Sequence, residues 1–392
     1  MRFLFATYPS PAHFFPMVPL GWALRAAGHE VLVATSPTFT EVVKASGLPA
    51  VVTGPDVDVA AVWGTVGLDP TAATSREDHV RLRSAKAIEM FATVADAMVD
   101  GTLALAERWQ PDLVVFESRA YAGPIVAARL GIPSARQLYG TDYTYSRWDF
   151  EGPFVAKLWE RRGWDPADPH GTLTVDPCPP SMQVPDAAPE RQPMRYVPYN
   201  GPALRPDWLD EPPARPRVCV TYGTTFAKLA RNLSPAVLAV EALRGLDVEI
   251  VAAISASQRE LLGDVPGVRV VTGMPLHLLL PTCSAVVHQG GAGTTLTSAV
   301  CAVPQFVVPS IGDEPLNARR IAATGAADYV DQHAATPEAI RDGVRRLLGD
   351  AAYRTAARRV QQENLLQPSP VEVAERLVRL ALGAPEPASA HG

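Results

Sequence analysis

Apolar residues occur in short runs that alternate with amphipathic stretches through the first part of the chain. The runs RFLFAT (2–7) and EVLVAT (30–35) predict buried strands, and MVPLGWALRAAG (17–28) between them has helical spacing and ends at a glycine. The same scheme returns in PDLVVFES (111–118), AGPIVAARLG (122–131) and the following IPSARQLY. A strand, a helix and another strand in this order form a βαβ unit, so a parallel sheet with right-handed crossovers is expected.

The pattern weakens in residues 140–215 and then returns. This segment is rich in proline and tryptophan and has no clear period, which predicts loops, short helices and a linker. Five further strands are predicted after it: RVCVTYG (217–223), VEIVAAIS (248–255), VRVVTG (268–273), SAVVHQ (284–289) and PQFVVPS (304–310). We therefore expect an α/β protein with two doubly wound domains at residues 1–205 and 216–370, followed by a C-terminal helix and disordered tail at 371–392.

Composition and charge restrict the class of protein. With 392 residues the chain exceeds what one hydrophobic core usually serves, and 47% hydrophobic with 19% charged residues is typical of a globular protein. The net charge of -6 comes without a basic stripe, which argues against nucleic acid as a partner. The opening MRFLFATYPS is too short an apolar run for a signal peptide or a spanning helix, so we expect a cytoplasmic protein without stable membrane insertion.

Two classes of cofactor chemistry lack their motifs. The turns after the first strand of each half, TYPSPAHFFP and TYGTT, hold no GxGxxG fingerprint, and GxxxxGK[ST] is absent, so nicotinamide and P-loop chemistry are not expected. The four cysteines show no CxxC spacing, and the eight histidines form no HxxxH pair beside a carboxylate. We expect reduced thiols, no metal and no cofactor.

The segment HQGGAGTT (288–295) follows the apolar run SAVV. Its glycines are Gly290, Gly291 and Gly293. If Thr294 and Thr295 open a helix, these glycines leave backbone amides bare at its N-terminus, which is a site for an anion such as phosphate. His288 would donate an imidazole N–H to a phosphate oxygen, and the Thr294 hydroxyl would add a donor. The alternative is that the glycines only tighten a turn and that His288 is a core residue.

The same segment is the centre of a longer resemblance. Family 1 glycosyltransferases, in particular the actinobacterial enzymes of natural-product (antibiotic) biosynthesis, have a donor-binding segment similar to MPLHLLLPTCSAVVHQGGAGTTLTSAVCAVPQFVVPSIGDEPLNARRI. The family's N-terminal strand, loop and helix resemble PAHFFPMVPLGWALRAAGHEVLVAT, and a mid-domain strand resembles PDLVVFES. The family's linker is similar to YVPYNGPALRPDWL and the start of its C-terminal half to VCVTYGTT. The similar segments span most of the chain in the family's order.

The resemblance implies the GT-B fold, in which two facing Rossmann-like domains enclose the active site in an interdomain cleft. Residues 1–205 would bind the acceptor and residues 216–370 the donor. A sugar, expected to be a deoxysugar linked to dTDP or UDP, would pass to a hydroxyl of a hydrophobic aglycone with inversion at the anomeric carbon and without a metal. Transfer to carbon or nitrogen stays open, as does a homodimer.

The acceptor hydroxyl is a weak nucleophile at neutral pH, so its proton has to be removed while the new bond forms. His13, in the loop after the first strand, matches the family's catalytic histidine, and imidazole is a suitable base because it titrates near neutral pH. Glu117 stands where the family places the carboxylate that orients this histidine, although many relatives have aspartate there. Without the resemblance, His13 is equally read as a cap of the following helix, and Glu117 as a solvated loop carboxylate.

On the donor side the resemblance assigns the diphosphate to the glycine-rich segment 288–295 and to the hydroxyl of Thr224. Asp313 and Glu314 stand where the family usually has Asp-Gln, a pair that binds sugar hydroxyls. An ionised carboxylate only accepts hydrogen bonds, so Glu314 would suit the ammonium group of an amino sugar. The alternative is that the two residues are a surface acidic pair.

The part of the donor site that binds the nucleobase departs from the family. Relatives often have a tryptophan at the position of Gly273, and its indole stacks on the base. This chain lacks that ring, so the base preference stays open. Backbone groups of Met274 are expected to pair with the pyrimidine edge.

Aromatic residues are concentrated between residues 139 and 154. Six lie there: Tyr139, Tyr143, Tyr145, Trp148, Phe150 and Phe154. This density in an irregular segment suits a wall for a flat, apolar acceptor such as an aromatic polyketide, because rings offer broad contact. The residues expected to complete the wall are Phe14, Trp63, Met90 and Phe91. The alternative is that the rings pin the irregular segment to the sheet.

Two other functions share this architecture. A nucleotide-sugar epimerase needs several acidic groups around the sugar and no aglycone pocket, which the aromatic cluster disfavours. A non-catalytic auxiliary protein would keep the fold without the site. His13, Glu117 and His288 argue against that reading, whereas Gly273 and Glu314 keep it open.

Overall fold

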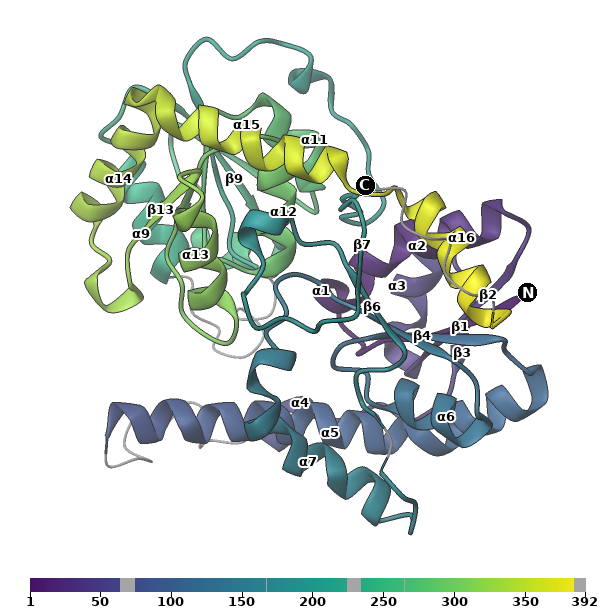
Figure 1. Ribbon diagram of the computed structural model, residues 1–392. Coiled ribbons are helices and arrows are strands. Elements are labelled where there is room, and N and C mark those ends of the chain that lie inside the picture. The colour runs from purple at the N-terminus through teal and green to yellow at the C-terminus, as the bar shows by residue number, and fades with distance from the viewer. Residues whose placement is uncertain (64–74, 167, 224–233, 264, 384–392) are drawn as a thin grey trace. The chain divides into compact units, whose positions relative to one another are not determined.

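The computed structural model describes residues 1–63, 75–166, 168–223, 234–263 and 265–383. The chain forms two compact units, which we call the N-terminal and the C-terminal unit (Figure 1). The N-terminal unit holds residues 1–177, 185–197 and the segment from Pro368 onward, and the C-terminal unit holds residues 178–184 and 198–367. The tail from residue 384, expected to be disordered, lies outside the described residues.

The N-terminal unit is built on a seven-stranded sheet in the order β3-β2-β1-β4-β5-β6-β7, in which every pair of neighbours is parallel. Its strands are β1 (Arg2–Ala6), β2 (Glu30–Thr35), β3 (Ala50–Val52), β4 (Leu113–Glu117), β5 (Ser134–Gln137), β6 (Leu173–Asp176) and β7 (Arg191–Pro193). Phe3, Leu4 and Phe5 of β1 are fully buried, as are residues 113–116 of β4. Such central strands are covered on both faces, which is why they are continuous apolar runs in the sequence. The strands predicted at 2–7, 30–35 and 111–118 are confirmed.

Helices connect these strands and cover the sheet. The helices of the N-terminal unit are α1 (Pro11–Phe14), α2 (Val18–Ala26), α3 (Thr40–Ala45), α4 (Val59–Trp63), α5 (Arg76–Trp109), α6 (Ala122–Leu130), α7 (Trp148–Glu160) and α16 (Pro370–Ala381). Figure 1 shows α7 alongside the long α5 and α16 alongside α2. α16 begins with a capping box between Ser369 and Glu372. The C-terminal helix therefore completes the N-terminal unit.

Regular structure in the segment 140–215 corrects the prediction of loops and short helices there. α7 has 13 residues and contains Pro153, a residue that usually interrupts a helix because it lacks an N–H donor. β6 and β7 extend the sheet at its edge with 4 and 3 residues. Strands this short show no apolar period, so the sequence does not predict them.

The C-terminal unit contains a second parallel sheet, with six strands in the order β10-β9-β8-β11-β12-β13. Its strands are β8 (Arg217–Val220), β9 (Glu249–Ile254), β10 (Val268–Thr272), β11 (Ala285–His288), β12 (Gln305–Val307) and β13 (Ala327–Tyr329). Its helices are α9 (Ser234–Leu243), α10 (Ala256–Leu262), α11 (Leu276–Leu279), α12 (Ala292–Val300), α13 (Glu314–Ala323), α14 (Pro337–Gly349) and α15 (Ala351–Leu366). The five strands predicted in this half are confirmed, and β13 is an additional edge strand. No helix in the described part of the chain is long and apolar enough to cross a membrane.

Each sheet has a point where the strand order reverses. In the N-terminal unit β1 lies between β2 and β4, and in the C-terminal unit β8 lies between β9 and β11. Ligands of open α/β sheets bind beyond the carboxyl ends of the strands at such a point. His13 follows β1 and Glu117 ends β4, whereas His288 ends β11, so the predicted site residues lie at both reversals.

Candidate active site

His13 and Glu117 come together at the carboxyl ends of β1 and β4. The two strands are neighbours, with Ala6 opposite Phe116, and α1 places His13 shortly after β1. The Nδ1 atom of His13 lies 3.1 Å from Oε1 of Glu117. The His13 side chain is 13% exposed and that of Glu117 is fully buried, so the base candidate is open to solvent while its acidic partner is not.

The carboxylate of Glu117 is held by the residues that follow it. Its Oε1 accepts hydrogen bonds from the Ser118 hydroxyl at 3.0 Å and from the backbone N–H of Arg119 at 2.9 Å. Its Oε2 is buried without a hydrogen-bond partner among the described residues. The His13 contact is within ion-pair distance but misses hydrogen-bond geometry. Catalytic pairs are often misaligned in this way without substrate and tighten when it binds.

Three aromatic rings surround the imidazole of His13. The ring centres of Tyr8, Phe91 and Tyr139 lie 5.0, 5.6 and 4.7 Å from that of His13. The Tyr8 hydroxyl donates to the sulfur of Met90 at 3.7 Å. Burial, reinforced by the charge of Glu117, raises the pKa of Tyr8 to about 12. Tyr8 therefore stays protonated at neutral pH.

Tyr145 and Trp148 pack against a histidine of their own unit. Their ring centres lie 4.8 and 4.6 Å from that of His170, whose Nδ1 accepts a hydrogen bond from Arg136 at 3.3 Å. Burial and the charge of Arg136 lower the pKa of His170 to about 4. Arg136 in turn is paired with the buried Asp142 at 2.6 Å. For these two rings the structure matches the alternative in which aromatic residues pin the irregular segment.

Phe14 and Trp63 were also predicted to line the acceptor wall. Phe14 is fully buried and packs edge-on against Phe39 at 5.9 Å between ring centres, so it belongs to the core and its assignment to the acceptor wall is wrong. It neighbours His13, but adjacent residues of a short helix point in different directions. The side chain of Trp63 lies outside the described part of the structure.

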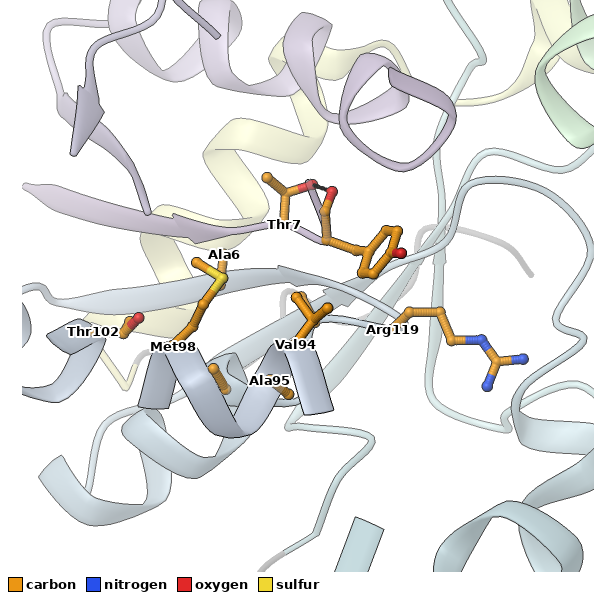
Figure 2. A pocket seen from close by; sticks show the side chains of 10 residues that line it. Ala6, Thr7, Val94, Ala95, Met98, Thr102 and Arg119 are labelled. Atoms are coloured by element: carbon orange, nitrogen blue, oxygen red, sulfur yellow. Dashed lines mark hydrogen bonds between the residues drawn. The ribbon is translucent and has the colours of Figure 1, made fainter. Parts of the chain in front are cut away.

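A small pocket lies between the end of β1 and α5. Figure 2 shows Val94, Ala95 and Met98 of α5 on one side of it and Ala6 and Thr7 on the other. The side chain of Arg119 leaves this pocket, and its guanidinium points away from Val94 (Figure 2). The pocket is therefore lined mainly by apolar side chains, and the guanidinium of Arg119 is paired with Glu151 instead.

The glycine-rich turn joins β11 to α12, but the helix begins two residues before Thr294, which was expected to open it. α12 begins at Ala292 with Gly291 as its N-cap and without a side-chain hydrogen bond at the cap. Gly290 has a φ of +94°, and a Cβ there would lie 3.0 Å from the carbonyl oxygen of Glu314 and from Val307. Around Gly293 the space is open, and Thr294 is half-buried. An uncapped helix N-terminus with a close backbone turn suits an anion.

The role expected for His288 needs correction. His288 is fully buried; its Nε2 lies 2.9 Å from Oε1 of Gln305, and its Nδ1 accepts from the N–H of Gly290 at 3.0 Å. Both ring nitrogens are used inside the protein, so the imidazole has no N–H left for a phosphate oxygen. Burial lowers the pKa of His288 to about 4 and keeps the ring neutral. His288 therefore fixes the turn that presents the amides.

Glu314 is likewise engaged within the protein. Its Oε2 accepts hydrogen bonds from the backbone N–H groups of Ser310 at 2.9 Å and Ile311 at 3.0 Å, and its side chain is buried. The alternative of a surface acidic pair is therefore wrong for Glu314, whose buried carboxylate is bonded to the loop before α13. Asp313 is half-buried and accepts from Asn317 Nδ2 at 2.8 Å.

The segment expected to face the nucleobase has an unusual backbone. Gly273 is exposed, has a φ of +64° and has open space around a Cβ. Met274 is half-buried against the apolar cluster of β9 and β11. A tryptophan at position 273 would be strained in this left-handed conformation. Thr224 lies outside the described residues.

Comparisons with known proteins give the family of the chain. Models of the N-terminal and C-terminal domains of erythromycin biosynthesis protein CIII-like proteins match residues 22–223 and 237–380. The chain is 37% identical to 10-deoxymethynolide desosaminyltransferase of Streptomyces venezuelae, with 97% of each chain covered. It is 39% identical to L-demethylnoviosyl transferase of Streptomyces niveus, with 96% of this chain and 97% of that one covered. The chain belongs to the erythromycin biosynthesis protein CIII-like glycosyltransferases.

A solved structure agrees with this assignment. The crystal structure of glycosyltransferase VinC in complex with dTDP matches with a TM-score of 0.83 at 35% identity and covers 98% of this chain and 100% of that chain. The protein is thus a sugar-transferring enzyme of the natural-product type. Its two parallel-sheet, Rossmann-like domains have the GT-B fold, as the sequence predicted.

Two asparagines that the sequence did not single out contact segments assigned to the donor side. Asn317 donates to the carbonyl of Gly290 at 2.9 Å and so ties α13 to the glycine-rich turn. Asn200 accepts from both the backbone N–H and the ring Nδ1 of His277, at 3.1 and 3.0 Å. Asn200 lies in the segment that resembles the family's linker, and this is the one sequence feature that pointed to it. Among the residues that the structure describes, no three histidine, cysteine, aspartate or glutamate side chains group as metal ligands would.

Proposed function

We propose that this glycosyltransferase moves a deoxysugar from a dTDP-linked donor to a hydroxyl of a hydrophobic natural-product aglycone, such as an aromatic polyketide, with inversion at the anomeric carbon. One observation carries the proposal: a partly exposed histidine stands 3.1 Å from a buried carboxylate inside a ring of aromatic side chains. The relatives support it, since their names describe sugar transferases, and a solved neighbour is a rhamnosyltransferase complexed with spinosyn aglycone.

On the acceptor side, His13 acts as the general base. Its Nε2 takes the proton of the acceptor hydroxyl while the oxygen attacks the anomeric carbon. The bond from that carbon to the diphosphate oxygen breaks at the same time, and the electron pair leaves with the nucleotide. Glu117 accepts a hydrogen bond from Nδ1–H and stabilises the imidazolium that forms, because a buried carboxylate favours the cation.

On the donor side, negative charge grows on the leaving diphosphate. The first-turn amides of α12 and the positive end of its dipole stabilise that charge, and the Thr294 hydroxyl adds a donor. His288 and Asn317 act indirectly by holding Gly290 in its left-handed conformation. The charge is balanced by these groups in our proposal, without a metal.

The test is to incubate the purified protein with a panel of dTDP-deoxysugars and aromatic aglycones and to read product masses. We expect a product heavier than the aglycone by one sugar residue, with dTDP released only when an aglycone is present. Nucleotide binding without a product in any combination would support a non-catalytic binding protein, and an altered donor sugar without aglycone would support an epimerase.

The base is tested by His13→Ala. Loss of a general base typically costs about 10²- to 10⁴-fold in rate, so turnover should fall by that factor while dTDP binding is kept. His333→Ala, which removes an exposed histidine of the C-terminal unit, is the matched control and should leave both unchanged. A His13→Ala enzyme with the turnover of the parent removes His13 from the mechanism.

A further inference from the structure

Two guanidinium groups lie among the aromatic rings of the N-terminal unit. The Cζ atom of Arg119 is 5.0 Å from the ring centre of Phe91 and 5.9 Å from that of Tyr143. The Cζ atom of Arg147 is 4.6 Å from the Tyr143 ring centre. Phe91 also contacts the ring of His13. A continuous series of ring and cation contacts therefore leads from the base candidate to Arg147.

The two cations differ in their partners. Arg119 is paired with Glu151, whose Oε1 accepts from Nη2 at 3.1 Å and whose Oε2 accepts from Nη1, and both side chains are buried. The Tyr121 hydroxyl adds a contact at 3.0 Å to Arg119. Arg147 donates to the hydroxyl of Tyr143, and in the described part of the chain no carboxylate lies within ion-pair distance of its guanidinium. Arg119 is thus neutralised within the protein and Arg147 is not.

The environment of Arg147 disfavours an isolated cation. The residue is half-buried, and burial, with a contribution from the charge of Arg119, lowers the pKa of its guanidinium, whereas Glu151 acts in the opposite direction. A guanidinium remains charged at neutral pH and forms two parallel hydrogen bonds to an acidic oxygen group. An anion that arrives beside Tyr143 would therefore gain a charged partner that no described carboxylate occupies.

We propose that the acceptor carries an acidic oxygen, a carboxylate or an ionised phenol or enol on a planar ring system, and that Arg147 binds it while Tyr143 contacts the ring. This inference rests on the proposed function, because the acidic oxygen belongs to the molecule whose hydroxyl His13 deprotonates. It adds a charge requirement that an apolar wall does not impose. The competing role for Arg147 is to hold Tyr143 in place without touching the acceptor.

The experiment compares two probes that differ in one charge, 3,5-dihydroxy-2-naphthoic acid and its methyl ester. Their affinities are measured by quenching of tryptophan fluorescence in the parent, Arg147→Met and Arg161→Met. Arg161 follows α7 and is 63% exposed in a pair with Asp96, so its substitution makes the same charge change away from the rings. A charge-assisted contact predicts that the acid binds the parent about tenfold more tightly than the ester. Arg147→Met should abolish this difference and Arg161→Met should keep it.

Two outcomes overturn the inference. One is an acid that binds the parent no more tightly than the ester, which includes no detectable binding of the acid at millimolar concentration. The other is a difference that survives in Arg147→Met; a purely structural role of Arg147 would weaken both probes equally. If Arg147→Met does not fold, as judged by thermal unfolding, Arg147→Lys replaces it and should keep part of the difference.

The experiments distinguish a failure of the proposed sugar transfer from a failure of the charged subsite at Arg147. If no donor and acceptor give a product while the acid still binds more tightly than the ester, sugar transfer is wrong and the charged subsite stands. If acid and ester are both glycosylated with equal KM, sugar transfer stands and the charged subsite is wrong.

Discussion

Each unit has a histidine beside the point where its strand order reverses, and the surroundings of the two histidines differ. His13 lies in α1, the helix that follows β1, and His288 is the last residue of β11, so both stand beside the reversal of strand order in their sheets. His13 keeps part of its ring exposed, and its Nδ1 lies 3.1 Å from a carboxylate oxygen of Glu117. His288 is fully buried, and both its nitrogens are bonded to neighbours within the C-terminal unit.

This difference in exposure and bonding decides which of the two rings is suited to proton transfer and which to a structural role. A base must exchange a proton with substrate, which requires a nitrogen that is free to do so and a nearby charge that stabilises the product cation. Burial without a carboxylate partner keeps imidazole neutral, which lowers the pKa of His288 to about 4. His288 is therefore unsuited to proton transfer and well suited to fixing the turn at Gly290.

The largest effect is expected at the partner of His13. Glu117→Gln keeps the size of the side chain and removes the charge that stabilises the imidazolium, so turnover should fall by about a hundredfold or more. Glu117→Asp restores the charge on a shorter side chain, so its turnover should lie between that of Glu117→Gln and that of the parent. Turnover is measured with saturating donor and acceptor, and a Gln variant as fast as the parent would show that the carboxylate is only structural.

The structural role of His288 is tested by the pH dependence of the free energy of unfolding. The folded-state pKa of His288, about 4, lies below the ordinary value of 6.5, so the unfolded chain binds a proton first as the pH falls. Its contribution is fully present above pH 6.5 and is lost progressively between 6.5 and 4, by up to about 3 kcal/mol. Urea unfolding at several pH values should show a smaller loss over this window for His288→Gln than for the parent. If the parent and His288→Gln lose the same free energy of unfolding over this window, the pH dependence comes from other titratable groups.

The turn that His288 holds is tested by two glycine substitutions. Gly290→Ala forces a left-handed conformation on a residue with a Cβ that also approaches backbone and Val307, which should cost at least about 1–2 kcal/mol of stability. Gly293→Ala meets open space at an ordinary φ and should keep the melting temperature of the parent. If both variants unfold at the same temperature, the strain assigned to Gly290 is absent.

The smallest effect is expected in the aromatic wall. Phe91→Leu removes a ring that contacts His13 and Tyr8, and should raise the KM for an aromatic acceptor about two- to tenfold, the value of one aromatic contact. Tyr145→Phe keeps the ring that packs on His170 and should leave KM unchanged. If Tyr145→Phe raises the KM more than Phe91→Leu does, Tyr145 contacts the acceptor and Phe91 does not.

The sequence predicts the parts of this structure that depend on local pattern. The central strands β1, β4 and β11 appear as apolar runs because both their faces are buried. The family resemblance paired His13 with Glu117, and the structure places them 3.1 Å apart because β1 and β4 are neighbours.

The rest depends on contacts between distant segments, which one sequence does not contain. The bond of His288 to Gln305 follows from the pairing of β11 with β12, and this pairing decides that the ring is not available to a ligand. The burial of Phe14 depends on Phe39 from another segment. Glu314 differs from these two, because its bonds are local: the backbone N–H groups of Ser310 and Ile311, four and three residues before it, donate to its carboxylate, and no apolar pattern indicates such a turn.

The most direct test is the single-turnover rate at saturating donor and acceptor for His13→Gln, measured beside His288→Gln. The account predicts that His13→Gln loses about a hundredfold or more in rate and keeps its melting temperature, because only the proton acceptor is gone. His288→Gln should unfold at a lower temperature and lose far less of the rate. A His13→Gln enzyme that turns over within twofold of the parent would contradict the division of roles between the two histidines.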